Sequence, residues 1–537
     1  MQFRPFRRVL VANRGEIAAR VVRGCHERGV EALAVYSEAD RDALHVRLAD
    51  LAVEIGPAPS SESYLRQDVL LEVARAHGCD AVHPGYGFLS ENAGFAEKVV
   101  AAGLVWIGPP PSAISAMGSK TAARQRMQAA GVPLVPGTVE PVSDPDEAMA
   151  IARDIGLPVM LKAAAGGGGK GMRRVDHERD LAAALTAARS EARKAFGDDS
   201  VYVEKLVVDP RHVEVQVLAD RHGTTVHLFE RDCSIQRRHQ KVIEETPCPV
   251  LPEATRRKLT EAAVAATKAV GYVGAGTCEF LYDPKADAFY FLEMNTRLQV
   301  EHPITEMVTG VDLVAAQLRV AAGEALWFAQ GDLQQTGHAI ECRIYAEDAA
   351  ENFRPAPGPL HGYREPAGGW VRTDAGVVEG MVVPVHYDPM IAKLVVWGRD
   401  RAEAIDRCRR ALRDYHLVGV PTSIPFFLEV LDDPDFVAGT YHTGFITPEW
   451  LQEHLGAPDV DDDLLALAAI ARYQADSARA PAGAVASGSD WKRLHRWRSR
   501  KGSGGDLRDR ARRARGERVG ASGRRGWRVS VDSGRGG

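Results

Sequence analysis

Five polar residues at alternate positions form the most informative chemical pattern in the chain. In the stretch FYFLEMNTRLQVEHPITE they are Glu293, Asn295, Arg297, Gln299 and Glu301. If this strand stays extended, the five side chains point to one face. Two carboxylates, two amides and a guanidinium there suit a small anion bound beside a cation. A solvated strand face would alternate in the same way, but the buried-strand composition of FYFL favours a functional site.

A further carboxylate lies a short distance upstream, in the strand-like stretch GTCEFLYD, which carries Glu279. Two carboxylates and an amide oxygen from neighbouring strands are hard ligands of the kind that Mg²⁺ prefers, often shared with substrate phosphates. Isolated glutamates are more often surface residues. The prediction of a magnesium site therefore depends on the glycine-rich stretch that accompanies them.

That stretch, KAAAGGGGKGM, spans residues 162–172 and holds four glycines between two lysines. Ordering four glycines costs backbone entropy, so the run suggests that the backbone approaches a ligand closely. Unobstructed amides can converge on phosphate oxygens, and Lys162 and Lys170 add positive charge. The stretch lacks GxxxxGK[ST] and is not a Walker loop. A plain flexible loop is the alternative.

Basic residues complete the set of candidates. RDCSIQRRHQK (231–241) places Gln236, His239 and Lys241 near a strand end, and ECRIYAED contributes Arg343. Alone, the first stretch would be a solvated basic patch or a weak nucleic-acid contact. Its position between strands that carry the other candidates favours an active site. Sequence physics alone leaves Arg343 as an ion-pair residue.

The elements that must position these residues are readable from apolar patterning. RRVLVAN (7–13) predicts a buried strand, GEIAARVVRGCHERG a helix that stops at Gly29, and EALAVYS the next strand of a parallel α/β unit. Residues 210–301 alternate as half-buried antiparallel strands do. The resulting divisions are 1–118, 119–334 with a glycine-loop segment at about 134–208, 335–450, 451–498 and 499–537.

Composition restricts the class of protein. The 537 residues contain no apolar run of membrane-spanning length, and the first residues lack a signal-peptide pattern, so we expect a cytoplasmic protein without a membrane role. The seven cysteines are scattered and never spaced CxxC, which argues against a zinc site and a disulfide framework. Residues 492–537 carry 16 basic and 4 acidic residues, whereas the body is acidic, so nucleic acid is not an expected partner.

The motifs KAAAGGGGKGM, ERDCSIQRRHQKVIEE, EMNTRLQVEHPITE, GHAIECRIYAED and HPGYGFLSEN together resemble the biotin carboxylase component of biotin-dependent carboxylases, over about residues 5–450. The resemblance implies an α/β and α+β multidomain ATP-grasp fold, with an N-terminal Rossmann-like α/β domain, a glycine-loop lid and a C-terminal biotin carboxylase domain. It implies ATP- and bicarbonate-dependent carboxylation of biotin through carboxyphosphate, as in the first half-reaction of an acyl-CoA carboxylase of the acetyl-, propionyl- or methylcrotonyl-CoA type.

The resemblance also implies roles for residues. Those expected to bind ATP are Lys120, Lys162, Gly167, Gly168, Gly169, Glu204, Lys205, Val207, His212, Gln236, His239, Glu279 and Glu293. Glu279, Glu293 and Asn295 are expected to hold Mg²⁺ or Mn²⁺. Bicarbonate would lie against Lys241, Arg297, Gln299 and Val300, with Glu301 as the base. Arg343 would stabilise charge on biotin, and Tyr86 would pack near it.

The implied partners are a second copy of the chain in a homodimer, a biotin carboxyl carrier protein and a carboxyltransferase subunit. Because no MKM tripeptide occurs, we expect biotin to arrive on a separate protein. A carbamoyl-phosphate synthetase half or a purine-pathway carboxylase would share the ATP-grasp logic, and an inactive scaffold or an RNA-binding tail are alternatives of another class. The Gly- and Arg-rich segment 499–537 predicts a basic disordered tail, either functional or the product of a reading-frame shift.

Overall fold

The computed structural model describes residues 6–138, 140–163, 172–196 and 198–455. Residues 1–457 form one compact unit of the chain. The expectations for Gly167, Gly168 and Gly169, for most of segment 451–498 and for the basic tail therefore lie outside the described residues. So does the side chain of Lys120, whose backbone begins a helix.

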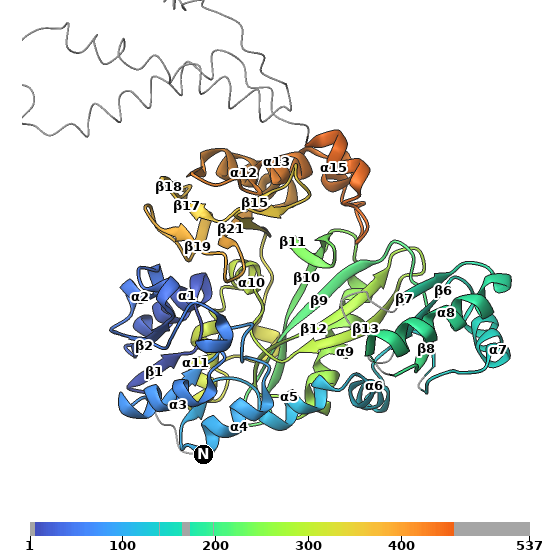
Figure 1. Cartoon of the computed structure of the whole chain (residues 1–537), viewed down its shortest axis with the longest axis horizontal. Helices are drawn as coiled ribbons and strands as arrows, with labels where there is room; N and C mark the ends of the chain where they lie inside the picture. Colours follow the sequence, from blue (N-terminus) through green and yellow to red (C-terminus); the bar gives the residue numbers. More distant parts are fainter. Residues whose placement is uncertain (1–5, 139, 164–171, 197, 456–537) are drawn as a thin grey trace, which may run out of the picture. The chain divides into compact units, whose positions relative to one another are not determined.

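The N-terminal part is a five-stranded parallel sheet with the order β3-β2-β1-β4-β5. Its strands β1 and β2 are labelled in the blue part of Figure 1. Its strands are β1 (Arg8–Val11), β2 (Glu31–Tyr36), β3 (Leu51–Glu54), β4 (Ala81–His83) and β5 (Val105–Trp106). Its helices are α1 (Gly15–Glu27), α2 (Leu44–Leu48), α3 (Gln67–Ala76), α4 (Ala93–Ala101) and α5 (Pro111–Gly118), with 3₁₀ turns at Glu38–Asp40 and Ser60–Glu62. The predicted strand–helix–strand unit is confirmed. Gly29 ends its helix with a positive φ of 68°, which glycine adopts without strain.

A small antiparallel sheet, β7-β6-β8, carries the residues around the glycine-rich stretch. Its strands are β6 (Val159–Ala163), β7 (Met172–Val175) and β8 (Val201–Lys205). The helices of this region are α6 (Lys120–Ala129), α7 (Pro145–Ile155) and α8 (Glu178–Phe196). Val159, Leu161 and Val203 pack with apolar residues of α7 and α8 into a core of their own.

The largest element is an eight-stranded sheet with the order β13-β12-β9-β10-β11-β14-β21-β19. Its strands are β9 (Arg211–Ala219), β10 (Thr225–Arg237), β11 (Gln240–Thr246), β12 (Gly274–Asp283), β13 (Ala288–Asn295), β14 (His338–Tyr345), β19 (Val371–Ala375) and β21 (Met390–Gly398). β11 and β14 pair antiparallel, so the sheet contains strands from both sides of the predicted division between residues 334 and 335. The sheet therefore joins residues that lie far apart in the sequence.

Helices and short ladders cover this sheet. The helices are α9 (Glu253–Ala269), α10 (His302–Thr309), α11 (Leu313–Ala321), α12 (Arg401–Asp414), α13 (Ile424–Asp432), α14 (Pro434–Ala438) and α15 (Pro448–His454), with a 3₁₀ turn at Gln330–Asp332. The two-stranded ladders are β15 (Glu347–Asp348) with β16 (Arg354–Pro355), β17 (Gly358–Pro359) with β20 (Val382–Val383), and β18 (Gly362–Arg364) with β22 (His416–Val418). Ile340, Cys342 and Ile344 face the core that includes α12, so their neighbours at odd positions face α10. That odd face carries Arg343.

Candidate active site

A cavity of about 690 Å³ lies among the loops of the parallel sheet, one end of the eight-stranded sheet and the loop before β21. Most of the predicted site residues line it: Tyr86, His212, His239, Lys241, Glu279, Glu293, Asn295, Arg297, Gln299, Val300 and Arg343. The wall opposite the sheet comes from residues that the sequence did not single out, among them Glu16 and Tyr387. Tertiary structure thus gathers candidates that are spread over 258 positions of sequence, from residue 86 to residue 343.

Strand register explains the concentration of charge. Glu279 on β12 lies opposite Glu214 on β9 and opposite Glu293 on β13, so three carboxylates stand in a row across neighbouring strands. Like charges directly opposite one another are destabilising, and they persist only where cations compensate them. The compensating cations come from the adjacent strands β10 and β11.

Lys241 is the first of these cations. Its Nζ lies 2.5 Å from Glu214 Oε2, 2.8 Å from Glu279 Oε1 and 2.8 Å from Glu301 Oε1. Burial opposes the charge of Lys241, but the three carboxylates outweigh it and raise the pKa well above its usual value. The ammonium therefore stays charged at every physiological pH.

Arg343, on β14, is another cation that contacts the predicted base. Its Nη2 lies 3.0 Å from Glu301 Oε2 and 2.5 Å from Glu244 Oε1. Burial would raise the pKa of Glu301, which is fully buried, yet Lys241, Arg343 and Arg231 hold it well below its usual value. Burial wins at Glu244, whose pKa is raised to about 7. The two carboxylates that share Arg343 are thus tuned in opposite directions.

The extended strand assumed for residues 293–301 is wrong, because β13 ends at Asn295. Arg297 folds back instead, donating from Nη2 to Asn295 Oδ1 at 3.0 Å and from Nη1 to Gln299 Oε1 at 3.0 Å. Glu301 then precedes α10, whose second residue is Pro303, a residue favoured in the first helical turn. A turn rather than a strand brings Glu301 to Lys241 and Arg343.

Glu91, which the sequence interpretation missed, positions the same turn from the N-terminal part. Its Oε2 accepts from Arg297 Nε at 2.8 Å, and its Oε1 accepts from the Thr296 amide at 3.1 Å. The residue belongs to HPGYGFLSEN, a stretch quoted for its resemblance alone. Its role was unreadable because the contact spans about two hundred positions.

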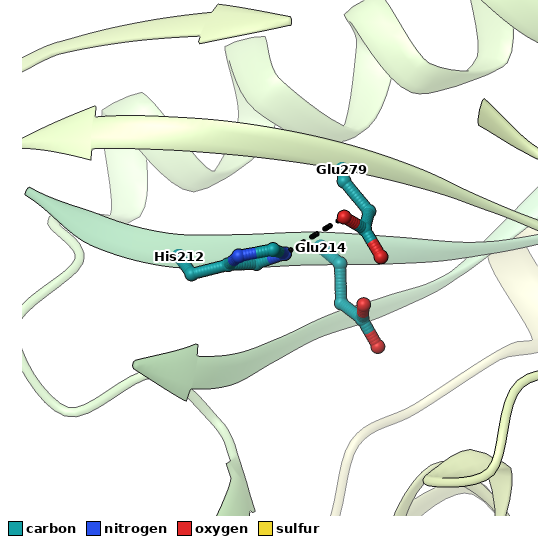
Figure 2. Close-up of side chains that lie close together, drawn as sticks. All are labelled: His212, Glu214 and Glu279. Atoms are coloured by element: carbon teal, nitrogen blue, oxygen red, sulfur yellow. Dashed lines mark ion pairs between the residues drawn. The ribbon is translucent and has the colours of Figure 1, made fainter. Parts of the chain in front are cut away.

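The predicted metal ligands offer suitable donors. Glu279 Oε1 accepts from Asn295 Nδ2 at 2.8 Å, and Glu279 Oε2 lies 3.0 Å from His212 Nε2. Figure 2 shows the imidazole directed toward Glu279, with Glu214 beside them, and ligand atoms of these three residues lie within 4.8 Å of one another. Carboxylate oxygens of the buried Glu279 and the exposed Glu293, with the amide oxygen of Asn295, are donors of the kind that suits a hard divalent cation such as Mg²⁺. Gln236 Nε2 lies 3.0 Å from His212 Nδ1 and orients the ring.

Lys162, Glu204 and Lys205 lie on the three-stranded sheet. Lys162 Nζ lies 2.5 Å from Glu204 Oε2, and Glu204 Oε1 accepts from Arg124 Nη1 at 2.9 Å. Lys205 Nζ donates to the carbonyls of Gly156 and Leu157 at 2.9 and 3.0 Å. Val207 is buried just after β8.

Arg231 and Glu214 are further residues that sequence analysis missed. Both are fully buried, and Arg231 Nε donates to Glu214 Oε1 at 2.6 Å. A signal was available, because each is a charged residue inside a strand-like apolar run. All seven cysteines are buried and free. Among the described residues, helices that are both long and apolar enough to cross a bilayer are absent.

Three family models match the chain in succession. Residues 5–114 match the biotin carboxylase N-terminal domain, residues 119–328 the ATP-binding domain of the carbamoyl-phosphate synthase L chain, and residues 341–448 the biotin carboxylase C-terminal domain. The middle model alone would also be compatible with a carbamoyl-phosphate synthetase half. The first and third models favour a biotin carboxylase instead.

Relatives and solved structures agree with these models. A pyruvate carboxylase subunit of Methanothermobacter thermautotrophicus is 54% identical over 441 residues, covering 82% of this chain and 89% of the relative. The propionyl-CoA carboxylase alpha chain of Ruegeria pomeroyi is 49% identical over 491 residues, covering 87% and 72%. The biotin carboxylase domain of Hydrogenobacter thermophilus 2-oxoglutarate carboxylase, solved as a dimer with MgADP and bicarbonate, matches with a TM-score of 0.76 and 44% identity, over 84% of this chain and 98% of that one. The expected multidomain α/β fold is confirmed.

Proposed function

Because the chain belongs to the biotin carboxylase family, we propose that it carboxylates biotin on a separate carrier protein with ATP and bicarbonate, as the first half-reaction of an acyl-CoA carboxylase. One observation carries the proposal. Glu301, fully buried and ionised, lies between Lys241 and Arg343, next to a cavity lined by Arg297, Gln299 and Val300. A positioned base beside an anion-binding surface is what bicarbonate activation requires.

Bicarbonate binds against Lys241, Arg297, Gln299 and the backbone of Val300 in this proposal. Its hydroxyl proton passes to Glu301, and the resulting oxygen attacks the γ-phosphorus of ATP as the bond to ADP breaks. The product is carboxyphosphate. We expect the pKa of Glu301 to rise when Lys241 and Arg343 turn toward the incoming anions, because these cations hold it low in their absence.

Carboxyphosphate then breaks into CO₂ and phosphate. The phosphate takes the proton from the ureido nitrogen of biotin, and that nitrogen attacks CO₂. Negative charge that develops on the ureido oxygen is stabilised by Arg343, which lines the cavity together with Tyr86, the ring proposed to pack near biotin. Burial of these groups strengthens the interaction by lowering the local dielectric.

In this proposal one set of residues contacts ATP directly, and a second set holds the Mg²⁺ that accompanies it. The contacts of ATP are Lys120, Lys162, Gly167, Gly168, Gly169, Glu204, Lys205, Val207, His212, Gln236 and His239. Glu279, Glu293 and Asn295 would hold Mg²⁺, which neutralises phosphate charge and orients the leaving group when bound. The oxygen donors described above support this assignment. Residues 1–118, 119–334 and 335–450 are the functional divisions of the proposed enzyme.

An acyl-CoA is the proposed final acceptor, and the proposed second partner is a carboxyltransferase subunit. The match to the propionyl-CoA carboxylase alpha chain supports this, because it extends over more of the chain than the match to the pyruvate carboxylase relative. A homodimer is supported by the dimeric state given for the Hydrogenobacter domain. Seven free thiols and the use of ATP support a cytoplasmic location.

The direct test is ADP release from the purified chain with Mg²⁺ and ATP, with and without bicarbonate and free biotin. ADP release should require bicarbonate and increase with biotin, and labelled bicarbonate should appear on biotin. Rapid turnover indifferent to both compounds would overturn the proposal. Adding carrier and carboxyltransferase proteins with acetyl-, propionyl- or methylcrotonyl-CoA, or with pyruvate, then tests the acceptor, and transfer only to pyruvate would exclude an acyl-CoA.

A further inference from the structure

Lys393 on β21 is a fully buried lysine that the proposed chemistry does not use. Its Nζ donates to the carbonyl oxygen of Val300 at 2.8 Å. That carbonyl belongs to the peptide joining Val300 to Glu301, so the contact acts directly on the turn that carries the proposed base. Lys393 is also the cross-strand partner of Arg343, which contacts the carboxylate of Glu301. Lys393 therefore holds the backbone of Val300, while its neighbour Arg343 holds the side chain of Glu301.

The same ammonium reaches the N-terminal part of the chain. Glu16, at the start of α1, lies with Oε2 3.2 Å from Lys393 Nζ, and Asp374 on β19 lies with Oδ2 at 3.9 Å. Glu16 is 4% exposed and lines the cavity. Lys393 thereby connects one wall of the cavity to the turn before α10.

The third contact of Lys393 is with the ring of Tyr86, which is proposed to pack near biotin. The Nζ of Lys393 lies 5.9 Å from the ring centroid of Tyr86, at the outer limit of a cation–π interaction. Tyr86 also lines the cavity. One ammonium group thus lies against the backbone beside the proposed base, the carboxylate of Glu16 and the ring proposed to contact biotin.

Stability alone explains this arrangement poorly. Burying a lysine and a glutamate carries a desolvation cost that an apolar pair of similar volume would avoid. The cost is visible at Glu16, where burial raises the pKa to about 7 despite the opposing effect of Lys393. What the buried amine does supply is a donor to the Val300 carbonyl and a cation beside Glu16, at the turn that carries Glu301.

We propose that Lys393 is a positioning residue, which holds the Val300–Glu301 turn against Glu16 and so fixes Glu301 and the Val300 backbone relative to bicarbonate. The inference rests on the proposed function, because it assigns Lys393 to the same site. It adds a residue from the C-terminal part of the sheet that acts on the base without touching substrate.

The experiment compares wild type, Lys393→Met, the double variant Lys393→Met/Glu16→Gln and the control Lys285→Met. The single variant leaves Glu16 without its cation, and its folding is expected to suffer. The double variant removes both buried charges while keeping volume, so it should fold with a thermal midpoint near that of wild type. Lys285 is 75% exposed in its side chain and pairs with Asp209 at 3.5 Å, which makes it a matched surface control.

For the double variant we expect kcat/KM for bicarbonate to fall by about tenfold to a hundredfold, the usual effect of displacing a reacting group by about 1 Å, with KM for ATP unchanged. Wild-type bicarbonate kinetics in the folded double variant would overturn the inference. Failure of that variant to fold would show a purely structural role and overturn it equally. Absence of bicarbonate-dependent turnover in wild type and Lys285→Met would instead refute the proposed function itself.

Discussion

The proposed base and the proposed nucleotide contacts are built in contrasting ways. Around Glu301 the side chains are nearly inaccessible, with exposed fractions of 0% for Glu301, 9% for Arg343 and 12% for Lys241. Lys162 of the three-stranded sheet is 37% exposed, and Arg124 of α6, which also pairs with Glu204, is 25% exposed. Buried charges keep fixed positions and interact strongly, whereas exposed ones are screened by water and salt. Under the proposed function, this contrast fits preorganised acid–base chemistry in the first region and adaptable phosphate binding in the second.

The largest effect should come from the base. Glu301→Gln keeps shape and hydrogen-bonding capacity but removes the proton acceptor, so bicarbonate-dependent ADP release should fall about 10²-fold or more. Binding of ATP, measured by calorimetry or a fluorescent nucleotide, should stay near that of wild type. A variant that retains full turnover would show that the buried region does not supply the base.

Arg343→Ala should separate the two chemical steps. Biotin carboxylation should fall by about tenfold more than biotin-independent ATP cleavage, because one charge stabilised by Arg343 develops only on biotin. Some loss of ATP cleavage is also expected, since the guanidinium contacts Glu301 and Glu244. The two rates are measured as carboxybiotin formation and ADP release. Equal losses in both assays would refute the assignment to biotin.

Lys162→Met addresses the exposed region. Removing one phosphate contact should raise KM for ATP by about tenfold, a typical value for one charge-assisted hydrogen bond, and leave KM for bicarbonate unchanged. Arg153→Met, which removes a surface ion pair between α7 and Glu178 of α8, is the matched control and should change neither constant. If Lys162→Met altered the bicarbonate constant more than the ATP constant, the division between the two regions would be wrong.

The smallest effect is a change in pH dependence. Burial raises the pKa of Glu16 to about 7, with Lys393 and Arg372 lowering it and Asp374 raising it. A carboxyl whose folded pKa is raised binds a proton more tightly in the folded state. Its stabilising contribution is complete below about pH 4.5 and is lost as pH rises toward 7. Glu16→Gln should therefore flatten the fall in urea midpoint between about pH 5 and 7.5, and an unchanged slope would contradict the raised pKa.

Much of the local structure followed from the sequence. The apolar runs of β1 and β2 are short and continuous, and α1 has helical periodicity with a stop at Gly29, so these elements were predictable without tertiary information. Charged and amide side chains inside strand-like runs are rare without a function, and this drew attention to Glu279, Glu293 and Asn295, whose roles stay predictions. The true geometry of residues 293–301 was not, because periodicity cannot register a turn stabilised by Arg297 folding back on Asn295 and Gln299.

The sequence by itself determined which residue types the chain places at the ends of its strands, and the long motifs determined its family. Only the tertiary structure decided how those residues pair. The row of Glu214, Glu279 and Glu293 depends on strand register, and the contacts of Glu91 with Arg297 and of Lys393 with Val300 join residues roughly ninety to two hundred positions apart. The charge of a buried group depends on every neighbour within a few ångströms. Such neighbours are set by packing of the whole chain rather than by local spacing, which is why Glu301 and Glu244 share one arginine and differ in pKa.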